Sequence, residues 1–87
     1  MNWRVVFTQD AQKDAKKIVA AGLRSKVEEL IALLRRNPYQ SPPRFEKLVG
    51  DLSGAYSRRI NLQHRLVYQV CDPEKTVKII RIWTRYE

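Results

Sequence analysis

The first part of the chain changes from alternating to helical spacing of its apolar residues. Trp3, Val5 and Phe7 occupy alternate positions, which predicts a strand with one buried face. Thr8 is suited to cap a following helix, with Asp10 in its first turn, where negative charge is favoured. The apolar face of that helix would consist of Ala11, Ala15, Ile18 and Val19.

A second helix is predicted directly after Gly22, a residue type that commonly ends helices. It should end over residues 35–37, because Pro38 disfavours a helical conformation in the residue before it. The short link at Gly22 makes the two helices a helical hairpin, and a proline-rich loop follows over residues 38–43. The apolar face of the second helix would consist of Leu23, Val27, Leu30, Ile31 and Leu34.

The rest of the chain has the period-two spacing of strands. Strands are predicted near 45–49, 56–61, 64–71 and 77–85, with turns at Gly50–Asp51 and over 72–75. Each strand has one apolar side to bury, so the helical hairpin should cover one face of a twisted antiparallel sheet. This order predicts an α+β fold (β-α-α-β-β-β-β) and a single domain over residues 1–87, which is enough chain for one modest core.

Alternation also sorts the strand residues between the covered face and the opposite face of the sheet. An arginine-rich face can hold an anion, and an indole on it offers stacking to an unpaired base; the alternative is a charged face that is only solvated. The covered face would receive Tyr56, Ile60, Leu66, Tyr68, Val70, Ile80 and Ile82. The uncovered face would receive Arg59, Arg65, Arg81, Trp83 and Arg85, together with Ser57, Asn61, Val67 and Gln69.

The adjacent arginines Arg58 and Arg59 are sent to opposite faces by this alternation. Arg58 should lie beside the helices, where it could extend its charge to solvent or pair with a helix acid. A bulge at this point would exchange the roles of the two residues.

The net charge limits the class of partner. Seventeen Lys and Arg residues oppose nine acids, giving a net charge of +8. A field this positive around so small a protein favours nucleic acid, the ribosome or an acidic protein as partner. The sequence shows no membrane span and no secretion signal, and its one cysteine, Cys71, cannot form an internal disulfide, so we expect a cytoplasmic protein.

Glu46 is the acid that stands out chemically. It lies between Arg44 and Lys47, and neighbouring cations favour a charged carboxylate that could accept a proton. The alternative is an ordinary surface ion pair. His64, at a strand start, is interpreted as structural. The sequence has no metal-ligand cluster, glycine-rich phosphate loop or Ser/His/Asp spacing, so we expect no metal and no other cofactor.

Two motifs lie close together in the second half of the chain. Residues 52–60 read Leu-Ser-Gly-Ala-Tyr-Ser-Arg-Arg-Ile, and residues 64–68 read His-Arg-Leu-Val-Tyr. Together they resemble the Txe/YoeB branch of the RelE/ParE toxin superfamily. The Arg-Asn-Pro-Tyr at 36–39, the Phe-Glu-Lys-Leu at 45–48 and the aromatic Tyr86 are also placed as in the family. The likeness is close over residues 35–71 and looser at both ends.

The resemblance implies a microbial-RNase-like fold and an endoribonuclease that cuts mRNA in the A site of the 70S ribosome. By this resemblance, Glu46 takes the proton of a 2′-hydroxyl that attacks the adjacent phosphate, and Arg65 stabilises the charge on phosphorus. Arg59 supports Arg65, and Tyr86 helps to hold the RNA. No metal is needed, because the 2′-hydroxyl is an internal nucleophile. The further RNA-binding candidates are Lys47, Arg81 and Trp83.

The resemblance also implies that the protein is the toxin of a type II toxin–antitoxin system. Its cognate antitoxin would be acidic where it covers the basic face, and the toxin could form a homodimer. Two other hypotheses stay open. One is a ParE-like, non-enzymatic gyrase inhibitor, against which the combination of Glu46 and Arg65 argues. The other is a catalytically degenerate homologue that binds only RNA or antitoxin.

Two positions depart from the family pattern. The family has a histidine before its last tyrosine, and this chain has Arg85 there. A guanidinium is a poor proton donor but can neutralise a leaving oxygen electrostatically. The family often has a lysine three residues after its glutamate, and this chain has Val49. Arg85 is therefore a catalytic candidate whose role differs from that of the family histidine.

Overall fold

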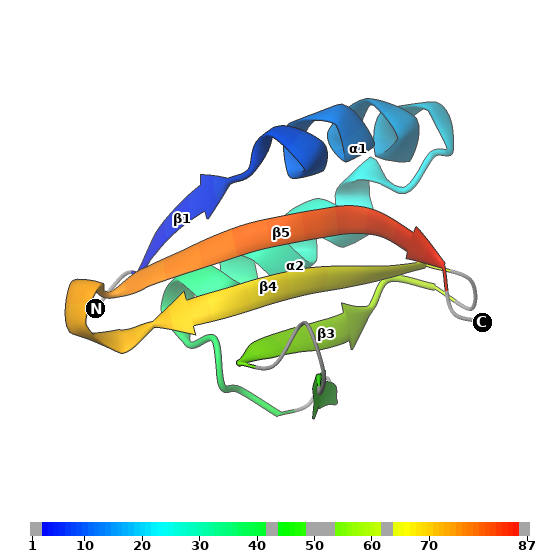
Figure 1. Ribbon diagram of the computed structural model, residues 1–87. Helices are drawn as coiled ribbons and strands as arrows, with labels where there is room; N and C mark the ends of the chain where they lie inside the picture. Colours follow the sequence, from blue (N-terminus) through cyan, green and yellow to red (C-terminus); the bar gives the residue numbers. More distant parts are fainter. Residues whose placement is uncertain (1–2, 42–43, 49–53, 62–63, 86–87) are drawn as a thin grey trace.

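The computed structural model describes residues 3–41, 44–48, 54–61 and 64–85, with the backbone alone described for 83–85. The predicted turn at Gly50–Asp51, together with Val49 and Tyr86, lies outside these residues. Figure 1 shows the arrangement of the elements. In chain order they are β1 (Arg4–Phe7), α1 (Gln9–Ala20), α2 (Arg24–Arg36), β2 (Phe45–Lys47), β3 (Ala55–Arg59), β4 (His64–Cys71), the short 3-10 helix η2 (Asp72–Glu74) and β5 (Thr76–Arg85).

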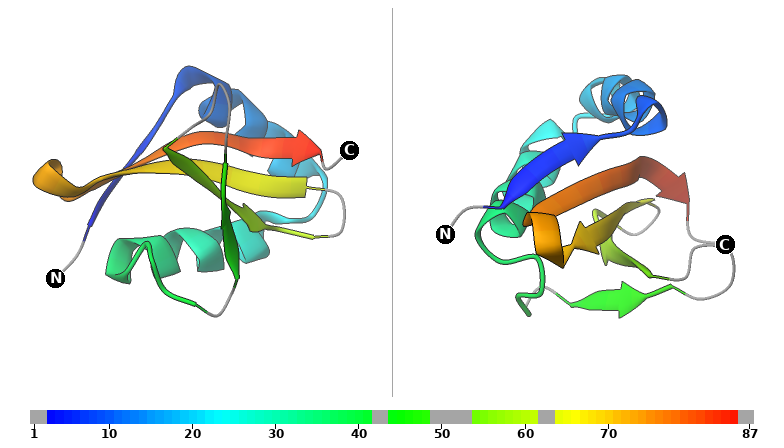
Figure 2. Two further views of the ribbon diagram at one scale, coloured as in Figure 1. Left: turned by 60° about the horizontal axis from the view of Figure 1, so that its bottom comes forward. Right: turned by 60° about the vertical axis from the view of Figure 1, so that its left-hand side comes forward.

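The five strands form one sheet in the order β1-β5-β4-β3-β2. The α+β class and the N-terminal helical hairpin are confirmed, and α2 passes behind β4 and β5 in Figure 1. The sheet is mixed, however, because β1 pairs parallel with β5 while the other pairs are antiparallel. A parallel pair needs a long connection, which the helices and the other strands provide. Figure 2 shows the twist of the sheet, with β2 turned steeply against β4 and β5.

Helix α1 begins and ends where the sequence predicts. Thr8 Oγ1 accepts a hydrogen bond from the backbone N–H of Ala11 at 3.1 Å, and Gly22 follows the helix with a φ of +75°. The prediction for Val19 is wrong, since this residue is 55% exposed. Asp14 is instead 2% exposed, which the apolar pattern did not predict. The buried stripe of α1 therefore includes an acid.

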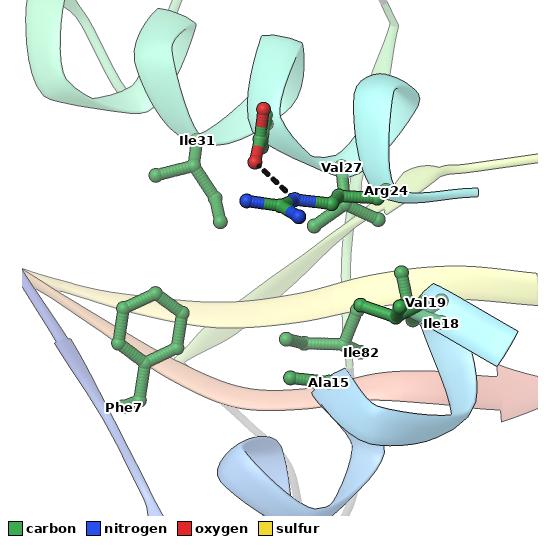
Figure 3. A pocket seen from close by; sticks show the side chains of 9 residues that line it. Phe7, Ala15, Ile18, Val19, Arg24, Val27, Ile31 and Ile82 are labelled. Carbon is green, nitrogen blue, oxygen red and sulfur yellow. Dashed lines mark hydrogen bonds and ion pairs between the residues drawn. The ribbon is translucent and has the colours of Figure 1, made fainter. Parts of the chain in front are cut away.

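Helix α2 ends at Arg36, in agreement with the stop predicted from Pro38. Its buried side chains are Val27, Leu30, Leu33 and Leu34. An apolar cavity of about 190 Å³ lies between the two helices over β5 (Figure 3). Phe7 and Ile82 line it from the strands, and the exposed Arg24–Glu28 ion pair, at 2.8 Å, belongs to its wall. The other residues that line it are Ala15, Ile18, Val19, Val27 and Ile31.

Helix α1 covers the edge of β5 beyond the end of β1. The parallel ladder of β1 ends where Phe7 pairs with Ile79. Thr8 Oγ1 then donates a hydrogen bond to the carbonyl of Ile80 at 2.8 Å, and the N–H of Ile82 donates to Asp14 Oδ2 at 3.1 Å. The side chains of the N-cap Thr8 and of Asp14 in the middle of α1 thus bind backbone groups that a neighbouring strand would otherwise pair.

Strict alternation fails in β5. Val77 and Ile79 are fully buried, Ile80 is only half-buried, and Ile82 is buried again. The register between β4 and β5 shifts twice around Val67, so β5 contains extra residues relative to its partner. The prediction that Ile80 lies in the core is therefore wrong, because the irregularity moves the core position to Ile79.

Candidate active site

Register places the predicted acid and two arginines on one face of the sheet. Glu46 pairs with Ser57, and Arg59 pairs directly with Arg65. Paired residues on neighbouring strands point to the same side, and positions two apart along a strand share that side. Glu46, Arg59 and Arg65 therefore lie on the face opposite the helices, which was predicted for the two arginines. We refer to these three residues as the Glu–Arg face.

The ladder between β3 and β4 is regular, which fixes the roles of the two adjacent arginines. Arg58 pairs with Leu66 and Arg59 pairs with Arg65, without a bulge between them. Arg59 is exposed on the Glu–Arg face, and Arg58 is fully buried on the helix side. The predicted orientation of both residues is confirmed.

The prediction that Arg58 could extend its charge to solvent is wrong, because its side chain is fully buried. Its guanidinium instead donates hydrogen bonds to the carbonyls of Pro38 and Gln40 at 3.1 and 2.7 Å and to Tyr68 Oη at 3.0 Å. Burial raises the pKa of Tyr68, while the nearby guanidinium acts in the opposite direction. Tyr68 Oη keeps its proton and donates to the carbonyl of Pro38 at 3.3 Å.

The centre of the Glu–Arg face is closed rather than open. Ser57 and Val67, which pair with each other, are each 1% exposed, and Ala55 is buried as well. The prediction of an uncovered face is wrong for Ser57 and Val67. Their side chains are shorter than those of neighbours on the same face, such as Arg65 and Glu46, so they lie at the base of this surface. Ser57 Oγ has no hydrogen-bond partner among the residues that the structure describes.

Lys47 is separated from the other candidates. It is exposed and pairs with Tyr56, one position beyond the Glu46–Ser57 pair. Adjacent positions in a strand point to opposite sides, so Lys47 lies away from the Glu–Arg face. Lys47 and Glu46 are adjacent in the sequence but lie on different faces of the sheet.

Arg81 is held by helix α1. Its Nε and Nη2 donate to the two carboxylate oxygens of Asp14 at 2.7 and 3.2 Å, and this bonding raises the pKa of Arg81 above its already high usual value. Arg81 pairs with Val67, a position on the side of the sheet that carries Arg59 and Arg65, but its guanidinium binds the helix acid Asp14. Its part in anion binding stays a prediction. Asp14 is thus a helix acid that pairs with a strand arginine, and this arginine is Arg81.

For Trp83 and Arg85 the structure describes the backbone, which belongs to the last part of β5. The backbone of Arg85 lies opposite His64, and that of Thr84 lies opposite Arg65. The register shifts around Val67 remove the basis for extending period-two alternation from Arg81 to the end of the strand. Arg85 therefore follows β5 to the same end of the sheet as Arg65.

His64 is buried at the start of β4, in the tight connection from β3. Its N–H donates to Asn61 Oδ1 at 2.8 Å, and its carbonyl accepts from the N–H of Ile60 at 2.9 Å. These contacts agree with the structural interpretation of His64.

Sequence reasoning missed an aromatic cluster on the helix side of β2 and β3. Tyr39 makes edge-to-face contacts with Trp3 and Tyr56 at ring-centroid distances of 6.3 and 6.1 Å, and Tyr56 contacts Phe45 in the same way at 5.5 Å. Burial and a 2.9 Å hydrogen bond to Asp72 raise the pKa of Tyr39 to about 12. These aromatic residues lie in segments that are far apart in the sequence, so no local pattern predicted the cluster.

Among the described residues, no group of His, Cys, Asp and Glu side chains could hold a metal ion. None of the described helices is long and apolar enough to cross a membrane.

Comparison with known sequences identifies relatives over most of the chain. A family model described as a YoeB-like toxin of bacterial type II toxin-antitoxin systems matches residues 6–86. Toxin YoeB of Mycobacterium bovis is 39% identical over 75 residues, which cover 84% of this chain and 88% of that protein. Toxin YoeB of Escherichia coli strain K12 is 40% identical over 70 residues, which cover 80% of this chain and 77% of that protein.

Solved structures agree with this relationship. A YoeB/ParE toxin from Agrobacterium tumefaciens superposes with a TM-score of 0.85 at 29% identity, over 95% of this chain and 99% of that chain. A chain of a YoeB–YefM complex from Staphylococcus aureus superposes with a TM-score of 0.80 at 34% identity, over 99% of this chain and 100% of that chain. YafQ of E. coli, at 20% identity, shares the fold. The matching family model and these identities show that the chain belongs to the YoeB-like toxins of bacterial type II toxin–antitoxin systems.

Proposed function

We propose that this toxin is a ribosome-dependent endoribonuclease that cuts mRNA in the A site of the 70S ribosome and so stops translation. The observation that carries the proposal is the register of β2, β3 and β4, which places Glu46 on the same face as Arg59 and Arg65. A carboxylate near two guanidinium groups suits a reaction in which a proton leaves and negative charge develops on a phosphate. Family membership agrees with this chemistry.

In the proposed reaction, Glu46 accepts the proton of the 2′-hydroxyl. The 2′-oxygen bonds to the adjacent phosphorus and the bond from phosphorus to the 5′-oxygen breaks. The leaving oxygen takes up a proton from a water molecule. Arg65 stabilises the charge on the phosphoryl oxygens, with Arg59 in support. Arg85 neutralises the leaving oxygen, and Tyr86 holds the RNA. The nucleophile belongs to the substrate, so the step proceeds without a metal.

The same face is the proposed binding surface for a cognate antitoxin. Solved relatives include a YoeB–YefM complex and a YoeB dimer, both from Staphylococcus aureus. We propose that an acidic segment of the antitoxin covers Arg59 and Arg65, which the chain's net charge of +8 favours. We also propose that the toxin forms a homodimer and acts in the cytoplasm, where ribosomes are available.

The direct test is cleavage of ribosome-bound message, followed by primer extension. Glu46→Gln removes the proton acceptor and Arg65→Ala removes charge from the transition state, so each should lose about a hundredfold or more in rate. Glu74→Gln, in η2 at the β4–β5 connection, is the matched acid control and should cleave normally. Undiminished cleavage by Glu46→Gln would exclude the general-base role.

A second candidate function is gyrase inhibition of the ParE kind, since the Agrobacterium neighbour is described as a YoeB/ParE toxin. Pulse-labelling after induction without antitoxin separates the two. We expect protein synthesis to stop first, with DNA synthesis following later. An early block in DNA synthesis with topoisomerase-linked breaks would favour gyrase. A wild-type protein that binds ribosomes without cutting message would identify a catalytically degenerate toxin, which the Arg85 replacement favours.

A further inference from the structure

Among the described residues, Arg58 has the largest side chain that is fully buried. It lies on the helix side of β3, directly behind the Glu–Arg face. Burial of a charged guanidinium is unfavourable unless good partners offset it. Those partners determine what Arg58 does.

The first set of partners is the loop that follows α2. Nη2 of Arg58 donates to the carbonyls of Gln40 at 2.7 Å and Pro38 at 3.1 Å, while Nε donates to Tyr68 Oη at 3.0 Å. Tyr68 Oη also donates to the carbonyl of Pro38 at 3.3 Å. One side chain thus ties the loop that leads toward β2 to the middle of the sheet.

The second partner is β2 itself. Phe45 pairs with Arg58 in the ladder, and the guanidinium carbon lies 4.8 Å from the centroid of the Phe45 ring. Tyr56 packs edge-to-face against the same ring at 5.5 Å. Strand β2 is only three residues long and lies at the edge of the sheet, with a neighbour on one side alone. Such a strand depends on side-chain anchors, and Phe45 is its anchor.

Glu46 directly follows Phe45 and points to the opposite side of β2. We propose that Arg58 is the positioning residue of the active site, holding Glu46 in place from behind through Phe45 and the loop at residues 38–40. The proposal rests on the proposed cleavage reaction for its catalytic consequence. Its structural part, the dependence of β2 on Arg58, can be tested without any activity.

The catalytic test uses a double-mutant cycle of Arg58→Lys, Phe45→Leu and the combined variant. Lysine keeps the charge but loses the planar fork and most of the stacking, so the loop and the ring should lose their common support. Each single variant should reduce the single-turnover cleavage rate by about a hundredfold, as misplacement of a catalytic group does. Because both act on Glu46 by the same route, the combined variant should be no slower than the worse single one.

Affinity separates positioning from general damage. Arg59 and Arg65 remain in all these variants, so binding to ribosomes programmed with a 2′-O-methyl message, which cannot be cut, should change less than about threefold. Ile18→Ala truncates the core on α1, away from β2, and serves as the control for lost stability. At a temperature where all variants are folded, this control should cleave at close to the natural rate. Rate losses that multiply in the combined variant would overturn the proposal.

Hydrogen exchange provides the readout that is independent of cleavage. The N–H of Leu48 donates to the carbonyl of Ala55 at 2.9 Å and reports on the attachment of β2. In Arg58→Lys and Phe45→Leu it should exchange at least tenfold faster, while the amides of β4 and β5 keep their protection. Unchanged exchange at Leu48, or equal acceleration throughout the sheet, would contradict the proposal. If the natural protein does not cut message, the cleavage proposal fails and this measurement still decides the role of Arg58.

Discussion

At the scale of single residues, neighbours in sequence perform different tasks because a strand sends them to opposite sides. Arg59 is exposed beside Arg65, whereas Arg58 is fully buried behind them and holds the loop after α2. Glu46 and Lys47 are separated in the same way. A cation therefore has to be assigned to a face before it is assigned a role.

Arg85 is one of the two residues at which this chain departs from the family pattern. If it acts only as a fixed charge on the leaving oxygen, Arg85→His should cut at least as fast, because an imidazole can also protonate that oxygen. The rate of this variant should gain a dependence on pH near 6 to 7, where histidine titrates. Arg85→Ala should be much slower than either protein. Single-turnover cleavage of ribosome-bound message across pH is the measurement.

Two outcomes would change the assignment of Arg85. Equal rates for Arg85→Ala and the natural protein would remove Arg85 from the reaction. An Arg85→His variant as slow as Arg85→Ala would show that the guanidinium supplies something that an imidazole cannot. The site would then resemble the RelE branch, which relies on Arg and Lys.

At the scale of elements, helix α1 acts as a substitute for a strand. Thr8 and Asp14 bind the carbonyl of Ile80 and the N–H of Ile82, which lie on the edge of β5 beyond its pairing with β1. Asp14 also holds Arg81, so one buried acid serves both a backbone group and a charge. This contact orders the part of β5 that leads to Arg85.

Removal of the Asp14 carboxylate should destabilise the protein mainly through the backbone contact. Asp14→Ala leaves the buried N–H of Ile82 without its acceptor, which costs about 1–3 kcal/mol. Asp14→Asn keeps an acceptor and loses only the ion pair with the partly exposed Arg81, so it should cost less than about 1 kcal/mol. Urea unfolding of the two variants tests this order. Equal losses would assign the stabilisation to the ion pair instead.

At the scale of the whole molecule, the charge of +8 is divided between separate surfaces. Arg59 and Arg65 lie on the Glu–Arg face, Arg81 pairs with Asp14, and Lys47 lies on the other side of β2. The molecule is small, with a radius of gyration of 12.0 Å, so its total charge can attract a polyanion before any one surface makes contact. Specific binding should depend on a smaller number of cations than the composition suggests.

Binding to a non-cleavable RNA should be strongly salt-dependent, with a logarithmic slope of about −0.7 for each phosphate neutralised on a single strand. Arg59→Gln should reduce the size of this slope by about one such contact. Lys47→Gln, on the opposite side of β2, should change it less. The measurement is the affinity of each protein across a series of salt concentrations. A slope that stays flat for the natural protein would show that the Glu–Arg face is only solvated surface.

Local patterns in the sequence were sufficient for most of the elements. Helix caps and stops act within one turn, so Thr8, Gly22 and Pro38 could be interpreted from their immediate neighbours. Regular alternation likewise placed Arg58 and Arg59 on opposite faces, since β3 and β4 pair without a shift. The motif block at residues 52–68 indicated the family that the comparisons confirmed.

Only the tertiary structure decided the features that depend on contacts between distant segments. The parallel pairing of β1 with β5 and the ion pair of Arg81 with Asp14 each join segments more than 65 residues apart. The irregularity near Ile80 arises because β5 has more residues than β4 over the same stretch of the ladder. The burial of Arg58 likewise depends on carbonyls of a loop about 20 positions earlier in the chain. Periodicity describes which way a side chain points from its own strand. It contains no information on what the fold brings against that side chain.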